Sequence, residues 1–180
     1  MKKAGRIISL VTAIVMCAML AGCGNAERWA YIHEPETEVL KLSDNGKAVY
    51  KGQKYKYTKD DSYITLTDGS GISQEHRYVM DGEQMIFYES STYDRDQSEP
   101  GEGVTGLWTQ DNGWLFQFNA DGKFSEENIF FGRYLVDESD HSIKLMYDDP
   151  IQDAVLYYSL DGDKLTIEYP WPMVKMATEN

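Results

Sequence analysis

Five short stretches combine aspartate with glycine and carry the carboxylates that could do chemistry in this chain. They read "DNGK" at 44–47, "DGSG" at 68–71, "DGEQ" at 81–84, "ADGK" at 120–123 and "DGDK" at 161–164. Closely spaced carboxylates could bind calcium or act as a catalytic pair, but a calcium loop also needs further oxygen ligands and a bidentate glutamate at its twelfth position. Around Asp121 one ligand position falls on Lys123, and no stretch supplies the distal glutamate. Because Asp-Gly is also a favoured hairpin pair, we predict five turns and no metal site.

The remaining motifs do not assemble a catalytic site. Residues 43–45, "SDN", match one motif of the penicillin-recognising enzymes, but the Ser-x-x-Lys and Lys-Thr-Gly motifs of that family are absent from the sequence. His33, His76 and His141 occur singly, without the spacing of zinc ligands, and are expected at the surface. No nucleophile elbow, zinc-protease motif or phosphate-binding loop is present in the sequence. We therefore expect a protein that is not an enzyme and needs no cofactor.

The N-terminal segment has the organisation of an export signal. Three basic residues in the first six positions precede an apolar run from 7 to 20. That run is shorter than the ~20 residues of a membrane-spanning helix and has the length of a signal-peptide core. It ends in "LAGC", residues 20–23, which closely resembles the lipobox of bacterial lipoproteins. The resemblance implies that residues 1–22 are removed, that Cys23 carries a diacylglyceryl anchor, and that the protein is extracytoplasmic and held at the cell membrane.

Charge and cysteine content limit the possible partners. Removing residues 1–22 takes three of the 17 basic residues and none of the 30 acidic ones, so the net charge becomes −16. A protein this acidic repels phosphate backbones and anionic lipid headgroups. We therefore expect no nucleic acid partner, and we expect the lipid alone to hold the protein to the membrane. Cys17 lies in the signal and Cys23 is the lipid attachment site, so no disulfide is expected and stability must come from a buried core.

The mature chain contains an internal duplication. "YVMDGEQMIFYE" at 78–89 matches "YSLDGDKLTIEY" at 158–169, 80 residues later, and "LKLSDNGK" at 40–47 matches "FQFNADGK" at 116–123. Between the copies the sequence is polar and rich in glycine and acidic residues, as linkers often are. We predict a first repeat at 27–93, a linker at 94–104 and a second repeat at 105–178.

Apolar and polar residues alternate with a period of two in both copies, as in "LKL" at 40–42, "FQF" at 116–118 and "IKL" at 143–145. No stretch of the mature chain has helical spacing. The predicted fold class is all-β, with two tandem antiparallel β-meanders joined by hairpins.

The second copy is similar to the small lipocalin-like domains of Gram-positive lipoproteins. The similarity rests on Gly106-Leu107-Trp108, on the stretch from Phe116 to Phe124, on Gly132-Arg133-Tyr134 and on the turn at 162–165. The first copy matches less well because Arg28 replaces the glycine before Trp29. The resemblance implies a meander that closes toward a small barrel, and it brings no catalytic residues.

Two places are candidates for binding. The inward residues Leu40, Leu42 and Ala48 of the first copy align with larger phenylalanines in the second copy, at 116, 118 and 124. The missing volume is either refilled by nearby tyrosines at 50, 55 and 57 or left as an apolar pocket.

The second candidate is Trp171, which lies between Pro170 and Pro172. The prolines indicate that this segment is not a central strand, and the tryptophan is either a plug for the barrel or an anchor for a partner. The sequence thus favours a non-enzymatic protein-interaction module of the cell envelope, with a binding protein for a small apolar ligand as the alternative.

Overall fold

The chain forms antiparallel β-structure throughout the part that the structure describes. The computed structural model describes residues 26–99, 101–148 and 150–177, and these residues contain fourteen strands and no helix. The strands of the N-terminal half are β1 (Ala26–Tyr31), β2 (Leu40–Ser43), β3 (Lys47–Tyr50), β4 (Gln53–Lys59), β5 (Tyr63–Thr67), β6 (Ser73–Asp81) and β7 (Gln84–Arg95). Those of the C-terminal half are β8 (Gly106–Thr109), β9 (Leu115–Phe118), β10 (Lys123–Glu126), β11 (Phe130–Asp137), β12 (Ser142–Tyr147), β13 (Ala154–Asp161) and β14 (Lys164–Lys175). The all-β prediction is confirmed.

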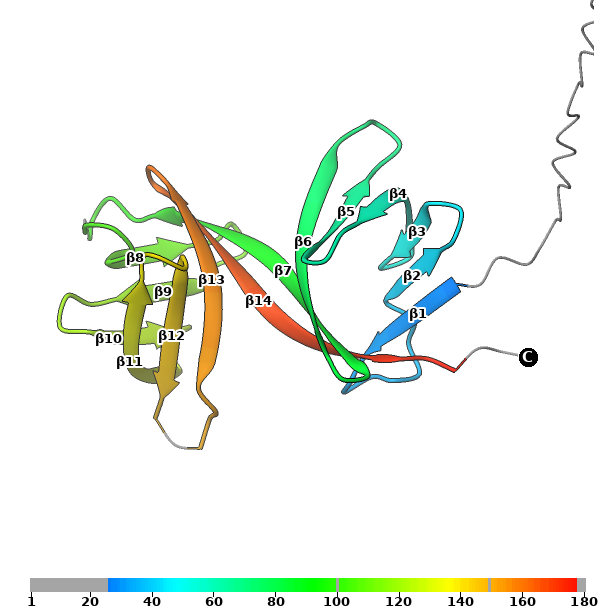
Figure 1. The fold of residues 1–180 in the computed structure, drawn as a ribbon. Helices are drawn as coiled ribbons and strands as arrows, with labels where there is room; N and C mark the ends of the chain where they lie inside the picture. Colours follow the sequence, from blue (N-terminus) through cyan, green and yellow to red (C-terminus); the bar gives the residue numbers. More distant parts are fainter. Residues whose placement is uncertain (1–25, 100, 149, 178–180) are drawn as a thin grey trace, which may run out of the picture.

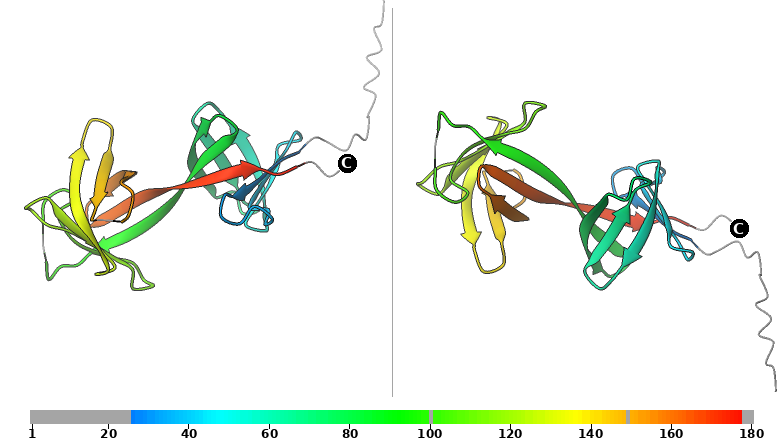
Figure 2. Two further views of the ribbon diagram at one scale, coloured as in Figure 1. Left: turned by 90° about the horizontal axis from the view of Figure 1, so that it is seen from below. Right: turned by 90° about the horizontal axis from the view of Figure 1, so that it is seen from above.

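The strands form one antiparallel ring that is crossed by a long ribbon. Each strand pairs with the next in sequence, and β1 pairs with β14 to close the ring. In addition β7 pairs with β14 along almost its whole length, from Asp94↔Lys164 to Gln84↔Val174. Figures 1 and 2 show the result, a first lobe of β1–β6 and a second lobe of β8–β13 joined by the ribbon of β7 and β14.

The buried side chains form two clusters, one in each lobe, and each cluster takes a residue from the other half of the chain. The first core contains buried residues from Trp29 to Phe87 and also Met173, which is fully buried. The second core contains residues from Val104 to Ile167 and also Tyr93, which is 1% exposed. Tyr93 and Met173 lie 80 residues apart, the same separation as between Gly82 and Gly162. The far end of β7 therefore completes the second lobe, and the far end of β14 completes the first.

Two of the aspartate–glycine pairs form the tight hairpins that flank this ribbon. Asp81 ends β6 and Asp161 ends β13, and two residues then connect each strand to the next. Gly82 and Gly162 take the first loop position with φ of 60° and 58°, which suits glycine and fits the right-handed twist of a hairpin. The turn prediction is confirmed at both hairpins.

Gly132 is required by a close approach between strands. A Cβ atom at this position would lie 2.1 Å from the backbone oxygen of Met146 and 2.9 Å from a ring carbon of Phe124. The residue sits in β11 opposite Tyr147 of β12, and the ring of Phe124 occupies the space above it. This packing explains why the sequence has glycine at this point of the strand.

The proline-flanked segment was predicted not to be a central strand, but it lies in β14. Pro170 pairs with Tyr88 and Pro172 with Ile86 of β7. The oxygen of Pro172 accepts a hydrogen bond from Ile32 N at 3.0 Å, so its polar backbone atoms point toward the first lobe and away from β7. Residues two apart in a strand point their backbone groups to the same side, so those of Pro170 also point away from β7. Neither proline therefore removes a hydrogen bond between β7 and β14.

His76 was expected at the surface and is buried. It is 7% exposed, and its Nδ1 lies 3.2 Å from the carbonyl oxygen of Tyr88. Its ring stacks on Phe87 at a centroid distance of 4.8 Å and meets Tyr50 edge-on. Burial lowers the pKa of this imidazole, so it acts as a neutral aromatic packing residue at pH 7.

Candidate binding site at the waist

The ribbon has two faces, and one of them runs continuously from the first core to the second. Phe87 points into the first core and Tyr93 into the second, with Glu89 between them on the same face of β7. The partners on β14 are Tyr169, opposite Glu89, and Trp171, opposite Phe87. Glu89, Tyr93, Tyr169 and Trp171 border an open pocket at the waist, whereas Phe87 is fully buried.

This waist pocket has a volume of about 380 Å³. It is lined by Glu89, Ser90, Ser91, Tyr93, Gln110, Asn112, Trp114, Glu126, Tyr169 and Trp171. Trp171 is 38% exposed and Trp114 50% exposed, so two indole rings are available at the rim. The pocket therefore combines exposed aromatic surface with carboxylate, amide and hydroxyl groups.

The second lobe contributes a half-buried carboxylate. Glu126 ends β10 on the same face as the buried Phe124, and its Oε2 accepts a hydrogen bond of 2.7 Å from the hydroxyl of Tyr147. Burial raises the pKa of Glu126 above its ordinary value, and the neighbouring Glu127 adds to this, while the Tyr147 hydrogen bond opposes it. Among the described residues Glu126 has no ion-pair partner. Its negative charge is therefore open to compensation by a ligand.

The ribbon contributes a carboxylate, Glu89, that residues of the first lobe already compensate. Glu89 accepts hydrogen bonds from the hydroxyls of Tyr31 and Tyr50, the latter at 2.7 Å, and its other oxygen lies 2.7 Å from Lys51 Nζ. Burial by itself would raise the pKa of Glu89, but the hydrogen bonds from Lys51, Tyr31 and Tyr50 together bring it below its ordinary value. Glu89 stays ionised and paired, so it shapes the pocket wall more than it attracts a ligand.

Trp171 is held from one side only. Its ring centroid lies 5.4 Å from that of Tyr31 and 6.1 Å from that of His33, and these two rings stack on each other. Neither core cluster includes Trp171. Of the two roles considered for this residue, plug and anchor, a ring that is braced behind and exposed in front fits the anchor.

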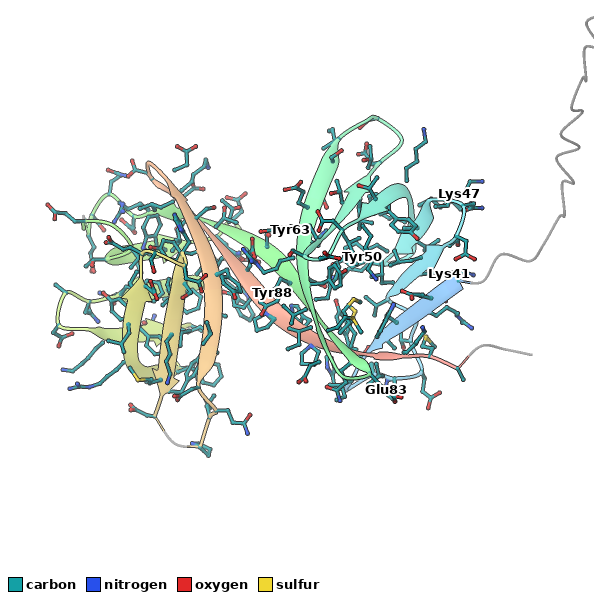
Figure 3. All side chains as sticks on the ribbon, in the orientation of Figure 1. Lys41, Lys47, Tyr50, Tyr63, Glu83 and Tyr88 are labelled. Carbon is teal, nitrogen blue, oxygen red and sulfur yellow. The ribbon has the colours of Figure 1, made fainter. Side chains whose placement is uncertain are left out.

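The opposite face of the ribbon ties the two lobes together. Arg77 of β6 forms an ion pair with Glu168 of β14 at 3.1 Å, and its guanidinium lies 4.0 Å from the ring centroid of Tyr157 in β13. Tyr88 meets the same Tyr157 ring edge-on at 5.4 Å, and Figure 3 shows Tyr88 on the ribbon between the lobes. These contacts connect the two lobes on the face of the ribbon opposite the pocket.

The pocket considered near Leu40, Leu42 and Ala48 is a packed part of the first core. These side chains are 0%, 2% and 3% exposed, and Tyr50 is buried beside them. Tyr55 and Tyr57 pack against the same cluster. Tyrosines thus fill the volume that the smaller side chains leave. The predicted lipid attachment site, Cys23, lies outside the described residues.

Of the residues that line the waist pocket, the sequence reasoning singled out only Trp171, and Trp114 and Glu126 are among those it missed. The sequence contained a signal for both Trp114 and Glu126. Glu126 follows Phe124 by two residues and so places a carboxylate at an inward position of an alternating strand. Trp114 follows a turn at 110–113, a place where a large apolar side chain has little to pack against.

The described part of the chain contains no cluster of three or more side chains suited to binding a metal ion, and it has no helix that could span a membrane. Comparison with protein-family models, with curated proteins and with solved structures finds no match to this chain.

Proposed function

We propose that this protein is a lipid-anchored, extracytoplasmic protein of a bacterial envelope that acts without catalysis as a protein-interaction module. In this proposal Cys23 carries the lipid, and the waist pocket receives a basic segment of an envelope protein. The observation that carries the proposal is the pair of exposed indole rings, Trp171 and Trp114, beside the uncompensated carboxylate of Glu126.

A cationic side chain fits this combination of groups. Lysine and arginine are attracted to the face of an indole ring, and a half-buried carboxylate gains from a positive partner. Tryptophan is also among the residues that contribute most to binding energy in protein interfaces. The net charge of −16 expected for the mature chain attracts a basic partner at long range and speeds its association.

We further propose that the two halves arose by tandem duplication of a small lipocalin-like barrel. The equivalent hairpins at Gly82 and Gly162 and the equivalent crossing residues Tyr93 and Met173 support this origin. The packed surroundings of Leu40, Leu42 and Ala48 argue against a lipocalin-type cavity in the first lobe. This favours the protein partner over the small apolar ligand.

The proposal is tested by titrating the segment 24–180, which contains every described strand, with an octapeptide of alternating arginine and glycine. We expect Trp171→Ala and Glu126→Gln each to weaken binding about fivefold, the loss that corresponds to about 1 kcal/mol of cation–π or charge pairing. Glu75→Gln is the matched control, because it removes an exposed acidic charge of β6 outside the pocket.

Equal affinities for Trp171→Ala, Glu126→Gln and the control would mean that the peptide binds by net charge alone and would refute the site. Binding of an apolar fluorescent probe that Ala48→Phe abolishes would instead favour the small-ligand alternative.

A further inference from the structure

The outer surface of β2, β3 and β4 carries four lysines that we call the lysine face, Lys41, Lys47, Lys54 and Lys56. In the sheet, Lys41 and Lys54 are both paired with Val49, and Lys47 lies directly opposite Lys56. The alternation of buried and exposed residues places all four side chains outward. Because like charges directly opposite each other destabilise a sheet, this arrangement costs the fold some stability.

These four lysines differ from the other lysines of the described chain, all of which form ion pairs. Lys51, Lys59, Lys123, Lys144, Lys164 and Lys175 each lie within 4 Å of a carboxylate oxygen. No described carboxylate pairs with any member of the lysine face. Of the two nearest acidic residues in sequence, Glu38 is paired with Arg28, and Asp44 lies in the β2–β3 turn. The lysine face is thus a local region of positive charge on an acidic protein.

A shallow hollow of about 320 Å³ lies among these lysines. Three of them line it, Lys41, Lys47 and Lys54, together with Ser43, Ala48, Val49 and Tyr55. Ammonium groups around a hydroxyl are suited to the phosphate of a lipid headgroup.

The lysine face lies beside the point where the chain enters the fold. Ala26, the first residue of β1, pairs with Ser43, and Ser43 pairs with Lys47. Figure 3 shows Lys41 and Lys47 beside the start of β1, and Figures 1 and 2 place this start at the end of the first lobe that is remote from the second. Cys23 precedes Ala26 by three residues, a distance of at most about 10 Å in an extended chain.

We propose that the lysine face docks on the anionic headgroups of the membrane that carries the protein. The net charge of the chain predicts repulsion from such a surface, but electrostatic interactions fall off over about 10 Å at 0.1 M salt. The acidic groups of the second lobe are then screened, while the lysines at the headgroups are not. Docking orients the first lobe against the bilayer and the second lobe away from it. This inference rests on the lipid anchor of the proposed function and is independent of the waist pocket.

The test uses the lipid-free segment 24–180 and sedimentation with vesicles of phosphatidylcholine containing a quarter phosphatidylglycerol, at 0.1 M salt. We expect binding to these vesicles, little binding to pure phosphatidylcholine, and loss of binding at 0.5 M salt. Each lysine that contacts the surface contributes about a fivefold increase in partitioning. Converting all four lysines of the face to glutamine should therefore reduce binding to the level seen with phosphatidylcholine alone.

The matched control changes the same amount of charge in the second lobe and at the adjoining start of β14, by converting Lys123, Arg133, Lys144 and Lys164 to glutamine. This variant should bind as well as the parent or less than twofold more weakly. Far-UV circular dichroism checks that both variants retain their β-structure. Equal losses in the two variants, or no binding of the parent to anionic vesicles, would overturn the proposal.

The outcome of this vesicle experiment can be distinguished from the outcome of the peptide titration that tests the proposed function. Trp171→Ala should keep full vesicle binding, and the variant of the lysine face should keep its binding of the arginine peptide. Loss of vesicle binding on Trp171→Ala would place the membrane contact at the waist and overturn the assignment to the lysine face.

Discussion

Replacing Met173 with alanine is expected to destabilise the first lobe, although Met173 lies near the C-terminal end of the chain. The side chain is fully buried in the first core, where β14 pairs with β1 opposite Tyr31 and with β7 opposite Met85. The substitution removes three heavy atoms, and the lost burial of each lowers the free energy of unfolding by about 0.8 kcal/mol. The cavity that remains brings the total loss to about 3 kcal/mol. The loss falls on contacts between β14 and the first lobe.

Native-state hydrogen exchange followed by mass spectrometry can locate this loss. If the first lobe opens without global unfolding, about 3 kcal/mol corresponds to exchange of its protected amides about 100-fold faster. The increase should appear in peptides from β1 to β6 and be much smaller in those from β9 to β12. Leu165→Ala is the matched control, because Leu165 is equally buried in the same strand but belongs to the second core.

The control should show the opposite pattern, with faster exchange in the second lobe. Faster exchange of the second lobe on Met173→Ala, with the first lobe unchanged, would mean that each half of the sequence completes its own core. That result would refute the crossed arrangement of β7 and β14.

Three further predictions concern the anchor, the close strand approach and the two carboxylates. Metabolic labelling with a radioactive fatty acid should label the wild-type protein and not Cys23→Ser, and equal labelling of both would exclude this lipidation site. Gly132→Ala should lower the free energy of unfolding by about 3 kcal/mol in urea denaturation, because its Cβ would lie 2.1 Å from a backbone oxygen of β12. Gly69→Ala, whose Cβ would meet no atom within 4 Å, should change it little, and equal losses would contradict the packing argument. The pH dependence of the melting temperature should separate the two glutamates, since the fold lowers the pKa of Glu89 and raises that of Glu126. Ionised Glu89 stabilises the protein above its unfolded pKa of about 4.3, and this is lost as the pH falls through its folded pKa. Glu89→Gln should therefore lower the melting temperature at pH 7, with the difference vanishing in acid. The raised pKa of Glu126 means that its ionisation costs stability as the pH rises above about 4.3, so Glu126→Gln should flatten this decline. Parallel curves for the two variants would contradict these assignments.

Local sequence was enough to determine the class of fold and the position of its turns. Gly82 and Gly162 follow an aspartate between two alternating stretches, and their positive φ depends only on residues within the hairpin. Alternation at 40–42 and 116–118 likewise identified the buried faces of β2 and β9, because successive side chains of a strand point to opposite sides. These features depend on neighbours along the chain and can be inferred from a single sequence.

The arrangement of the ribbon depends on contacts between distant residues. The period of two in β7 and β14 is the same whichever strands lie beside them, so nothing local to Tyr93 or Met173 indicates which core each one joins. Pairing between residues about 80 positions apart decides this, and it also gives Pro170 and Pro172 a place in a paired strand. The sequence thus predicted two copies of a β-meander, and the tertiary structure decided that the last strand of each copy extends into the other lobe.

The binding surfaces were decided by the tertiary structure for the same reason. The composition gives an acidic protein, but the register of β2, β3 and β4 places four lysines on one surface without carboxylate partners. At the waist, Trp114, Glu126 and Trp171 come from three separate segments and meet only because β7 and β14 cross from one lobe to the other. Charge, burial and pKa depend on distances in space, and in a β-protein those distances are set by strand pairing and not by separation along the chain.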